Sequence, residues 1–186
     1  MNKRGKLPAA LFLLLSIFPL FGGENALMDE KTAWTPPKYA KVVGYRFRVP
    51  GEDSKEPIPS GFSLLKNGTL DAAQLKRLAL KSVELHPEHI RSLITDVNAK
   101  EPTLPAACYD PHHIFVFYAD SGAAVAAIEV CFSCNGIRAL PDIAEPRWYR
   151  HDFVGFAKLT DDLGLWLEHR TVKEWISLQS ERNAPK

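Results

Sequence analysis

The sequence lacks the motifs that would name a reaction. It contains no internal repeat, no low-complexity tract, no glycine-rich phosphate loop and no serine-centred nucleophile elbow. Charge of one sign is also scarce, because 23 Lys and Arg side chains are balanced by 22 Asp and Glu side chains. The formal net charge of +1 provides no electrostatic footprint for nucleic acid or anionic lipid, which excludes nucleic acid as an expected partner.

Long hydrophobic runs are limited to residues 7–21, which are too few for the about 20 residues that a membrane-spanning helix needs. Lys3, Arg4 and Lys6 precede this run, so residues 1–23 have the layout of a signal peptide. No Ala-x-Ala cleavage pattern follows this run, so the alternative is that the segment is not cleaved and stays as a membrane anchor. We expect contact with a membrane only in that case. We expect an exported protein, periplasmic or secreted, with a net charge of −2 once residues 1–23 are removed.

Cysteine is the scarcest informative residue. The chain has 3 cysteines, and all of them lie between positions 108 and 134, together with two of its 6 histidines. An oxidising compartment favours disulfides, but three is an odd number. One thiol must therefore stay free, bind a metal or pair elsewhere.

A hairpin is expected inside this stretch. The polar turn Asp-Ser-Gly at 120–122 separates two apolar runs, 115–118 and 125–130, which is a hairpin signal. Both faces of both runs are mostly apolar, which is typical of central strands covered on both sides. A three-residue loop places His112 opposite Val130 and Cys108 level with Cys134, and a shift by one residue keeps these ends together. The cysteines and histidines should therefore gather at the open end of the hairpin.

Three kinds of chemistry fit such a cluster. The first is a tetrahedral zinc site, with Cys108, Cys131 and Cys134 as thiolate ligands and His113 or, alternatively, His112 as the fourth ligand. The second is a structural disulfide, since facing strands bring α-carbons within bonding range. The exported location favours this second interpretation.

The third is a redox-active Cys131-x-x-Cys134 pair, which normally needs a helix N-terminus to lower a thiol pKa. The Asn135-Gly136 turn that follows argues against such a helix. Glu129 could orient a histidine of the cluster. We expect instead that its side chain is exposed to solvent on a strand.

The pattern Cys108-Tyr-x-Pro-x-His113, an apolar hairpin and Cys131-Phe-x-Cys134 resembles a family of small exported bacterial proteins of unknown function. The resemblance extends over about residues 70–167. It implies that His113 matters more than His112, and it implies no reaction.

The remaining segments indicate a single α+β domain, residues 39–186, behind a tether at 24–38. A strand is expected at 41–49 and another at 137–140. Helices are expected from Ala72, with a stripe of Leu75, Leu78 and Leu80, from Pro87, at 153–163 and at 171–182. This order predicts a small, mainly antiparallel sheet with a central hairpin and about four flanking helices.

Two functions follow from the cluster. The first is an exported binding or structural domain whose hairpin end is pinned by the Cys/His cluster through a disulfide or a metal. The alternative is a thiol-dependent enzyme or redox protein that uses Cys131 or Cys134 with His113 as the base. Whether the protein is an enzyme is left open by the sequence.

Overall fold

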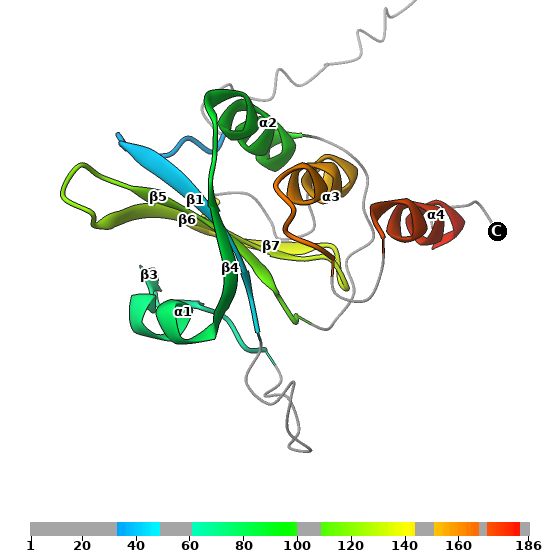
Figure 1. Cartoon of the computed structure of the whole chain (residues 1–186), viewed down its shortest axis with the longest axis horizontal. Coiled ribbons are helices and arrows are strands. Elements are labelled where there is room, and N and C mark those ends of the chain that lie inside the picture. Colours follow the sequence, from blue (N-terminus) through cyan, green and yellow to red (C-terminus); the bar gives the residue numbers. More distant parts are fainter. Residues whose placement is uncertain (1–32, 49–60, 100–108, 144–150, 168–170, 183–186) are drawn as a thin grey trace, which may run out of the picture.

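The computed structural model describes residues 33–48, 61–99, 109–143, 151–167 and 171–182 (Figure 1). The expected signal peptide, most of the expected tether, and Cys108 lie outside these residues. The elements in chain order are β1 (Lys41–Phe47), β2 (Leu65–Lys66), β3 (Thr69–Leu70), α1 (Ala72–Leu78), β4 (Ala79–Glu84), α2 (Pro87–Asn98), β5 (His113–Tyr118), β6 (Ala124–Cys131), β7 (Gly136–Leu140), α3 (Phe153–Asp162) and α4 (Val172–Arg182).

The main sheet has five strands in the order β4-β1-β5-β6-β7, and every neighbouring pair is antiparallel. Strands β2 and β3 form a separate two-stranded hairpin. The four helices and this sheet confirm the predicted α+β class and the central position of the β5–β6 hairpin.

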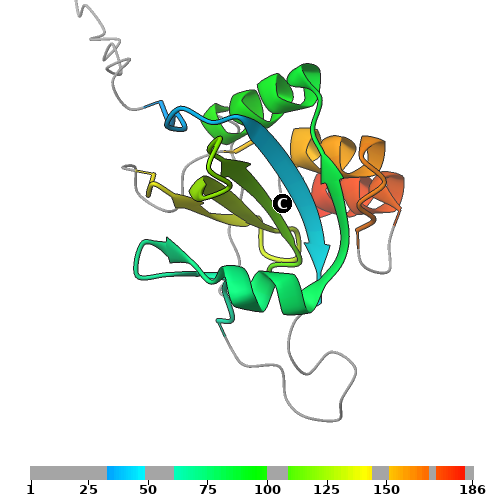
Figure 2. The ribbon, with the colours of Figure 1, turned by 60° about the vertical axis from the view of Figure 1, so that its left-hand side comes forward.

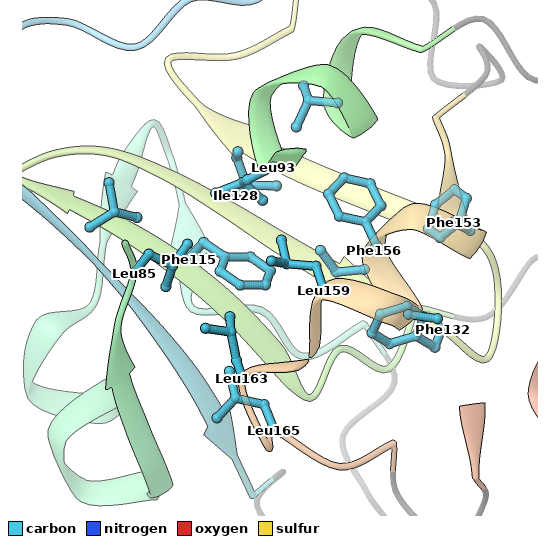
Figure 3. Close-up of a cluster of buried hydrophobic side chains, with 14 of the residues drawn as sticks. Leu85, Leu93, Phe115, Ile128, Phe132, Phe153, Phe156, Leu159, Leu163 and Leu165 are labelled. Carbon is cyan, nitrogen blue, oxygen red and sulfur yellow. The ribbon is translucent and has the colours of Figure 1, made fainter. Parts of the chain in front are cut away.

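The sheet is covered on both faces (Figures 1 and 2). Helices α2, α3 and α4 lie on one face, and α1 with the β2–β3 hairpin lies on the other. Figure 3 shows the larger core, in which side chains from the strands meet side chains from the helices: Phe115, Ile128, Leu93, Phe156 and Leu159. The smaller core packs α1 against the same strands. Burial on both faces explains why β5 and β6 are almost continuously apolar.

The hairpin loop is the predicted three-residue loop. Gly122 adopts a φ of 81° and donates to the carbonyl of Ala119 at 2.9 Å, while the Ala119 N–H donates to Ala123 at 2.9 Å. A bulge between Phe117 and Tyr118 then shifts the register by one residue. His113 therefore pairs with Val130, where counting from the loop alone placed His112.

Several local signals mark where the helices begin and end. Asp71 caps α1 by accepting from the Gln74 N–H at 2.9 Å, and Pro87 is in the first turn of α2. Thr171 accepts from the Glu174 N–H at 3.2 Å in front of α4, and Gly164 follows α3 with a φ of 63°.

The predicted helical stripe through Leu80 is wrong. Helix α1 ends at Leu78, and Leu80 belongs to β4, where its side chain is 43% exposed. The chain leaves the helix because residues 79–84 pair with β1, so tertiary pairing overrides the local helix propensity of this segment.

Trp34, from the segment expected to be a tether, is packed in the larger core. Its ring meets Phe117 edge-on at 5.6 Å, and its backbone N–H donates to Asn98 at 2.7 Å. The packed part of the chain therefore includes Trp34.

Candidate functional site

The Cys-x-x-Cys segment is the turn between β6 and β7. Cys131 ends β6 and pairs with Gly136, the first residue of β7, and residues 132–135 form the turn. Asn135 closes it with a φ of 50°, a left-handed conformation that asparagine tolerates. The first and fourth residues of a β-turn have α-carbons within about 7 Å of each other, a spacing close to that of disulfides, but Cys131 and Cys134 are free thiols in the structure.

Helix α4 holds this turn from the side. The indole N–H of Trp175 donates to the carbonyl of Phe132 at 3.1 Å, and the Asn135 amide donates to Gln179 at 2.8 Å. Phe132 also meets the ring of Trp175 edge-on at 5.5 Å. These contacts fix the turn, so the positions of both cysteines are set by tertiary packing.

The sulfur of Cys131 is surrounded by hydrogen-bond donors. The Cys134 thiol donates to it, and this contact is the largest cause of a lowered pKa at Cys131. The backbone N–H groups of Asp110, at 3.3 Å, and of Cys134 and Ser133 act in the same direction, whereas burial of the sulfur opposes them. As predicted, a turn and not a helix follows Cys134, and the turn itself supplies hydrogen-bond donors to the Cys131 sulfur.

Both cysteines are free thiols and both are buried, Cys131 completely. They therefore sit as a reduced pair joined by a sulfur hydrogen bond. A thiolate at Cys131 is the form that attacks a disulfide or binds a metal.

Glu129 lies on the same face of β6 as Cys131, two residues away, and is completely buried. The expectation of a solvent-exposed glutamate is therefore wrong. Its carboxylate accepts hydrogen bonds from Ser63 Oγ at 2.5 Å, from the Leu64 N–H at 2.7 Å and from the Tyr109 hydroxyl at 3.2 Å. These donors and Arg138 favour the charged form, but burial is the larger effect and raises the pKa of Glu129.

Tyr109 links this carboxylate to the cysteine turn. Its hydroxyl is inside the protein, where burial and the neighbouring Glu129 raise the tyrosine pKa well above its ordinary value. The guanidinium carbon of Arg138 lies 4.3 Å from the centre of the Tyr109 ring. A β-carbon added at Gly136 would lie 3.1 Å from the Cys134 sulfur and 3.3 Å from the Tyr109 ring, so that ring borders the cysteine pair.

The two histidines lie on different faces of the sheet. His113 pairs with Val130 and faces the helix layer, where its ring meets Phe132 edge-on at 5.1 Å and Nε2 is 3.2 Å from the carbonyl oxygen of Trp166. Continuing the register by one residue places His112 opposite Cys131, on the other face. The bulge in the hairpin shifts the register by one residue, so His113 takes the position opposite Val130 that was predicted for His112.

The structure brings Cys131 and Cys134 together and leaves His113 on the opposite face of the β5–β6 ladder. Among the described residues, no group of three or more His, Cys, Asp or Glu side chains is placed to hold a metal ion. Cys108 lies outside the described residues, so the four-ligand zinc site stays a prediction.

Three members of the site, Ser63, Leu64 and Arg138, were not predicted from the sequence, and Tyr109 was named only as part of the Cys108–His113 motif. The signal that could have found them is Glu129 itself, a carboxylate in the middle of an apolar central strand. Such a residue is buried only with hydrogen-bond partners, which must then come from elsewhere in the chain.

No protein-family model, no curated protein and no solved structure matches this chain. Within the described segments, no helix is long and apolar enough to span a bilayer. The arrangement defines a class of site, a buried dithiol at a β-turn.

Proposed function

We propose that the protein is an exported domain whose functional centre is the Cys131–Cys134 dithiol. Oxidation to a disulfide would cross-link the turn between β6 and β7. The observation that carries this proposal is the set of donors around the Cys131 sulfur: the Cys134 thiol, the Asp110 N–H at 3.3 Å and the N–H groups of the turn.

The chemistry is thiol–disulfide exchange with a small-molecule or protein disulfide as the oxidant. The Cys131 thiolate attacks one sulfur of that disulfide and expels the other sulfur as a thiolate. The Cys134 sulfur, after losing its proton, then attacks the Cys131 side of the mixed disulfide and expels the second thiolate. Two cysteine protons and two electrons pass to the oxidant, which becomes two thiols.

Two features support this assignment over a catalytic Cys–His pair. His113, the base expected from the sequence, is on the other face of the ladder and is engaged with Trp166 and Phe132. A nucleophile and its base must lie within hydrogen-bond reach. The Cys134 thiol and the N–H groups of Asp110, Ser133 and Cys134 favour the thiolate of Cys131, although burial of the sulfur opposes them.

The proposal also keeps the export expected from the basic and apolar residues of the N-terminal segment, since a disulfide persists in an oxidising compartment. Cell fractionation tests this part. Full-length chain recovered from the cytosolic fraction would contradict export.

The test of the dithiol is intact mass after purification from an exported fraction without chelator, followed by peptide mapping. We expect a loss of about 2 Da relative to the reduced protein, with the cross-link between Cys131 and Cys134. A Cys108→Ser variant should show the same loss and serves as the control. A cross-link to Cys108, or no cross-link after treatment with glutathione disulfide, would overturn the proposal, and stoichiometric zinc by elemental analysis would replace it with the metal site.

A further inference from the structure

We propose that Tyr109 is a movable cover over the Cys131–Cys134 pair, held closed by Glu129 and Arg138. The cover sets how fast small disulfides and other thiol reagents reach the sulfurs. This inference rests on the proposed function, because it concerns access to the same dithiol.

The backbone next to Tyr109 crosses the cysteine turn. Asp110 donates its N–H to the Cys131 sulfur at 3.3 Å, so the chain at residues 109–110 runs beside this sulfur. The Tyr109 ring lies beside the other sulfur, because the vacant side-chain position of Gly136 is 3.1 Å from Cys134 Sγ and 3.3 Å from Tyr109 Cδ2. Glycine at 136 thus leaves no side chain between the ring and the thiol.

Two contacts hold the ring in place. The Tyr109 hydroxyl donates to a carboxylate oxygen of Glu129 at 3.2 Å, with the Glu129 carbonyl at 3.4 Å. Arg138, the cross-strand partner of Glu129 on β7, places its guanidinium 4.3 Å from the ring centre. Glu129 is in turn held by Ser63 and Leu64, so the acceptor of the Tyr109 hydroxyl is itself fixed by two hydrogen bonds.

The burial pattern indicates that something must move. Cys131 and Cys134 are 0% and 3% exposed, whereas Tyr109 is only partly buried. A disulfide must reach the attacking sulfur, so exchange cannot take place in the closed arrangement. Release of one long hydrogen bond and one cation–π contact frees the Tyr109 ring, while Trp175 and Gln179 keep the turn on its other side in place.

The test measures alkylation of the reduced, folded protein by iodoacetamide, in a Cys108→Ser background so that only two thiols are scored. Tyr109→Ala should raise the rate at least about tenfold, the factor expected from loss of one hydrogen bond and one cation–π contact. Tyr109→Phe and Arg138→Gln each remove one anchor and should give intermediate increases. Exchange with glutathione disulfide should rise in the same order.

Tyr45→Phe is the matched control, because it removes a tyrosine hydrogen bond of 2.9 Å to Tyr118 that is not part of the dithiol site. Its alkylation rate should equal that of the parent. Equal rates in the parent, Tyr109→Phe and Arg138→Gln, all shown to be folded by circular dichroism, would overturn the cover even if Tyr109→Ala fails to fold. So would an equal increase in Tyr45→Phe, since general loosening would then explain the effect. The mass of the parent protein shows separately whether the dithiol forms a disulfide, so failure of the proposed function can be distinguished from failure of the cover.

Discussion

The Cys134 thiol donates a hydrogen bond to the sulfur of Cys131, and both groups are buried in one turn between two strands. A donated hydrogen bond stabilises the thiolate more than the protonated thiol, so it lowers the pKa of the accepting cysteine. In the proposed exchange, Cys131 would be the attacking sulfur and Cys134 would resolve the mixed disulfide, because the Asp110 N–H also donates to the Cys131 sulfur at 3.3 Å.

The first prediction follows from this donor. In a Cys108→Ser background, Cys134→Ala removes the S–H donor, so the pKa of Cys131 should rise and its reactive thiolate should decrease at neutral pH. The pH profile of Cys131 alkylation should therefore move to higher pH. Cys134→Ser, which restores a hydroxyl donor, should lie closer to the parent, and identical profiles for all three proteins would contradict the role of the donor.

The second prediction concerns the oxidised protein. A disulfide between positions 131 and 134 closes a very short loop, so chain entropy gives it only about 2 kcal/mol of stability, the low end for native disulfides. Cys134→Ala should be less stable than the oxidised parent by about this amount in urea unfolding. Under reducing conditions most of the difference should disappear; a difference that persists unchanged would mean that packing of the sulfur, not the cross-link, is what stabilises the turn.

The third prediction concerns Glu129, whose carboxylate joins β6 to the segment before β2. Glu129→Ala leaves the donors of Ser63, Leu64 and Tyr109 without their acceptor inside the protein. The free energy of unfolding should fall by about 3–5 kcal/mol. Glu129→Gln keeps an acceptor oxygen and should cost less, and Ser63→Ala, which removes one donor, should cost about 1 kcal/mol. An alanine variant as stable as the parent would contradict a structural role for this network.

Much of the local structure was predictable because it depends on near neighbours. The 120–122 loop, the Asp71 cap, Pro87 at the start of α2 and the turn at Gly164 each rest on residues within a few positions. These signals predicted the α+β class, which the structure confirms.

The remaining features depend on contacts between distant residues. The bulge near Tyr118 exchanges the faces of His112 and His113, and a bulge is not marked in the sequence. The burial of Glu129 depends on Ser63, which is 66 residues away. Strand β4 forms because β1 pairs with it. The spacing of Leu75, Leu78 and Leu80 predicts a helix there and carries no sign of this pairing.

The fourth prediction separates the two histidines. His113 packs on Phe132 and contacts the Trp166 carbonyl, so His113→Ala should lower stability by about 1–3 kcal/mol. Because His113 lies on the face opposite Cys131, the pH profile of Cys131 alkylation should not change in this variant, provided that it is compared below its melting temperature. His112→Ala is the comparison, since its side chain shares a face with Cys131. A profile that shifts in His113→Ala alone would restore His113 to the site.

The last prediction concerns Asp96, at the end of α2, which is 7% exposed and packs on the first turn of α3. Its carboxylate occupies the space beside Gly155, where an added β-carbon would lie 2.4 Å from Oδ1. The neighbouring charged groups are Asp152, which caps α3, and Lys158. His151 contacts the adjacent carbonyl of Val97 at 2.6 Å. Burial, followed by repulsion from Asp152, raises the pKa of Asp96 from 3.8 to about 7.

A carboxyl group whose pKa is raised by folding binds its proton more tightly in the folded state than in the unfolded state. Its contribution is therefore present at low pH and is lost as the pH rises from about 4 to about 7, at up to about 1.4 kcal/mol per pH unit. Asp96→Asn cannot lose a proton, so this variant should match the parent near pH 4 and be more stable than the parent at pH 8. Urea unfolding across this range measures the difference, with the exposed Asp161→Asn on α3 as the control. If Asp96→Asn and the parent differ by the same amount at pH 4 and pH 8, the carboxyl of Asp96 does not titrate with a raised pKa in the folded protein.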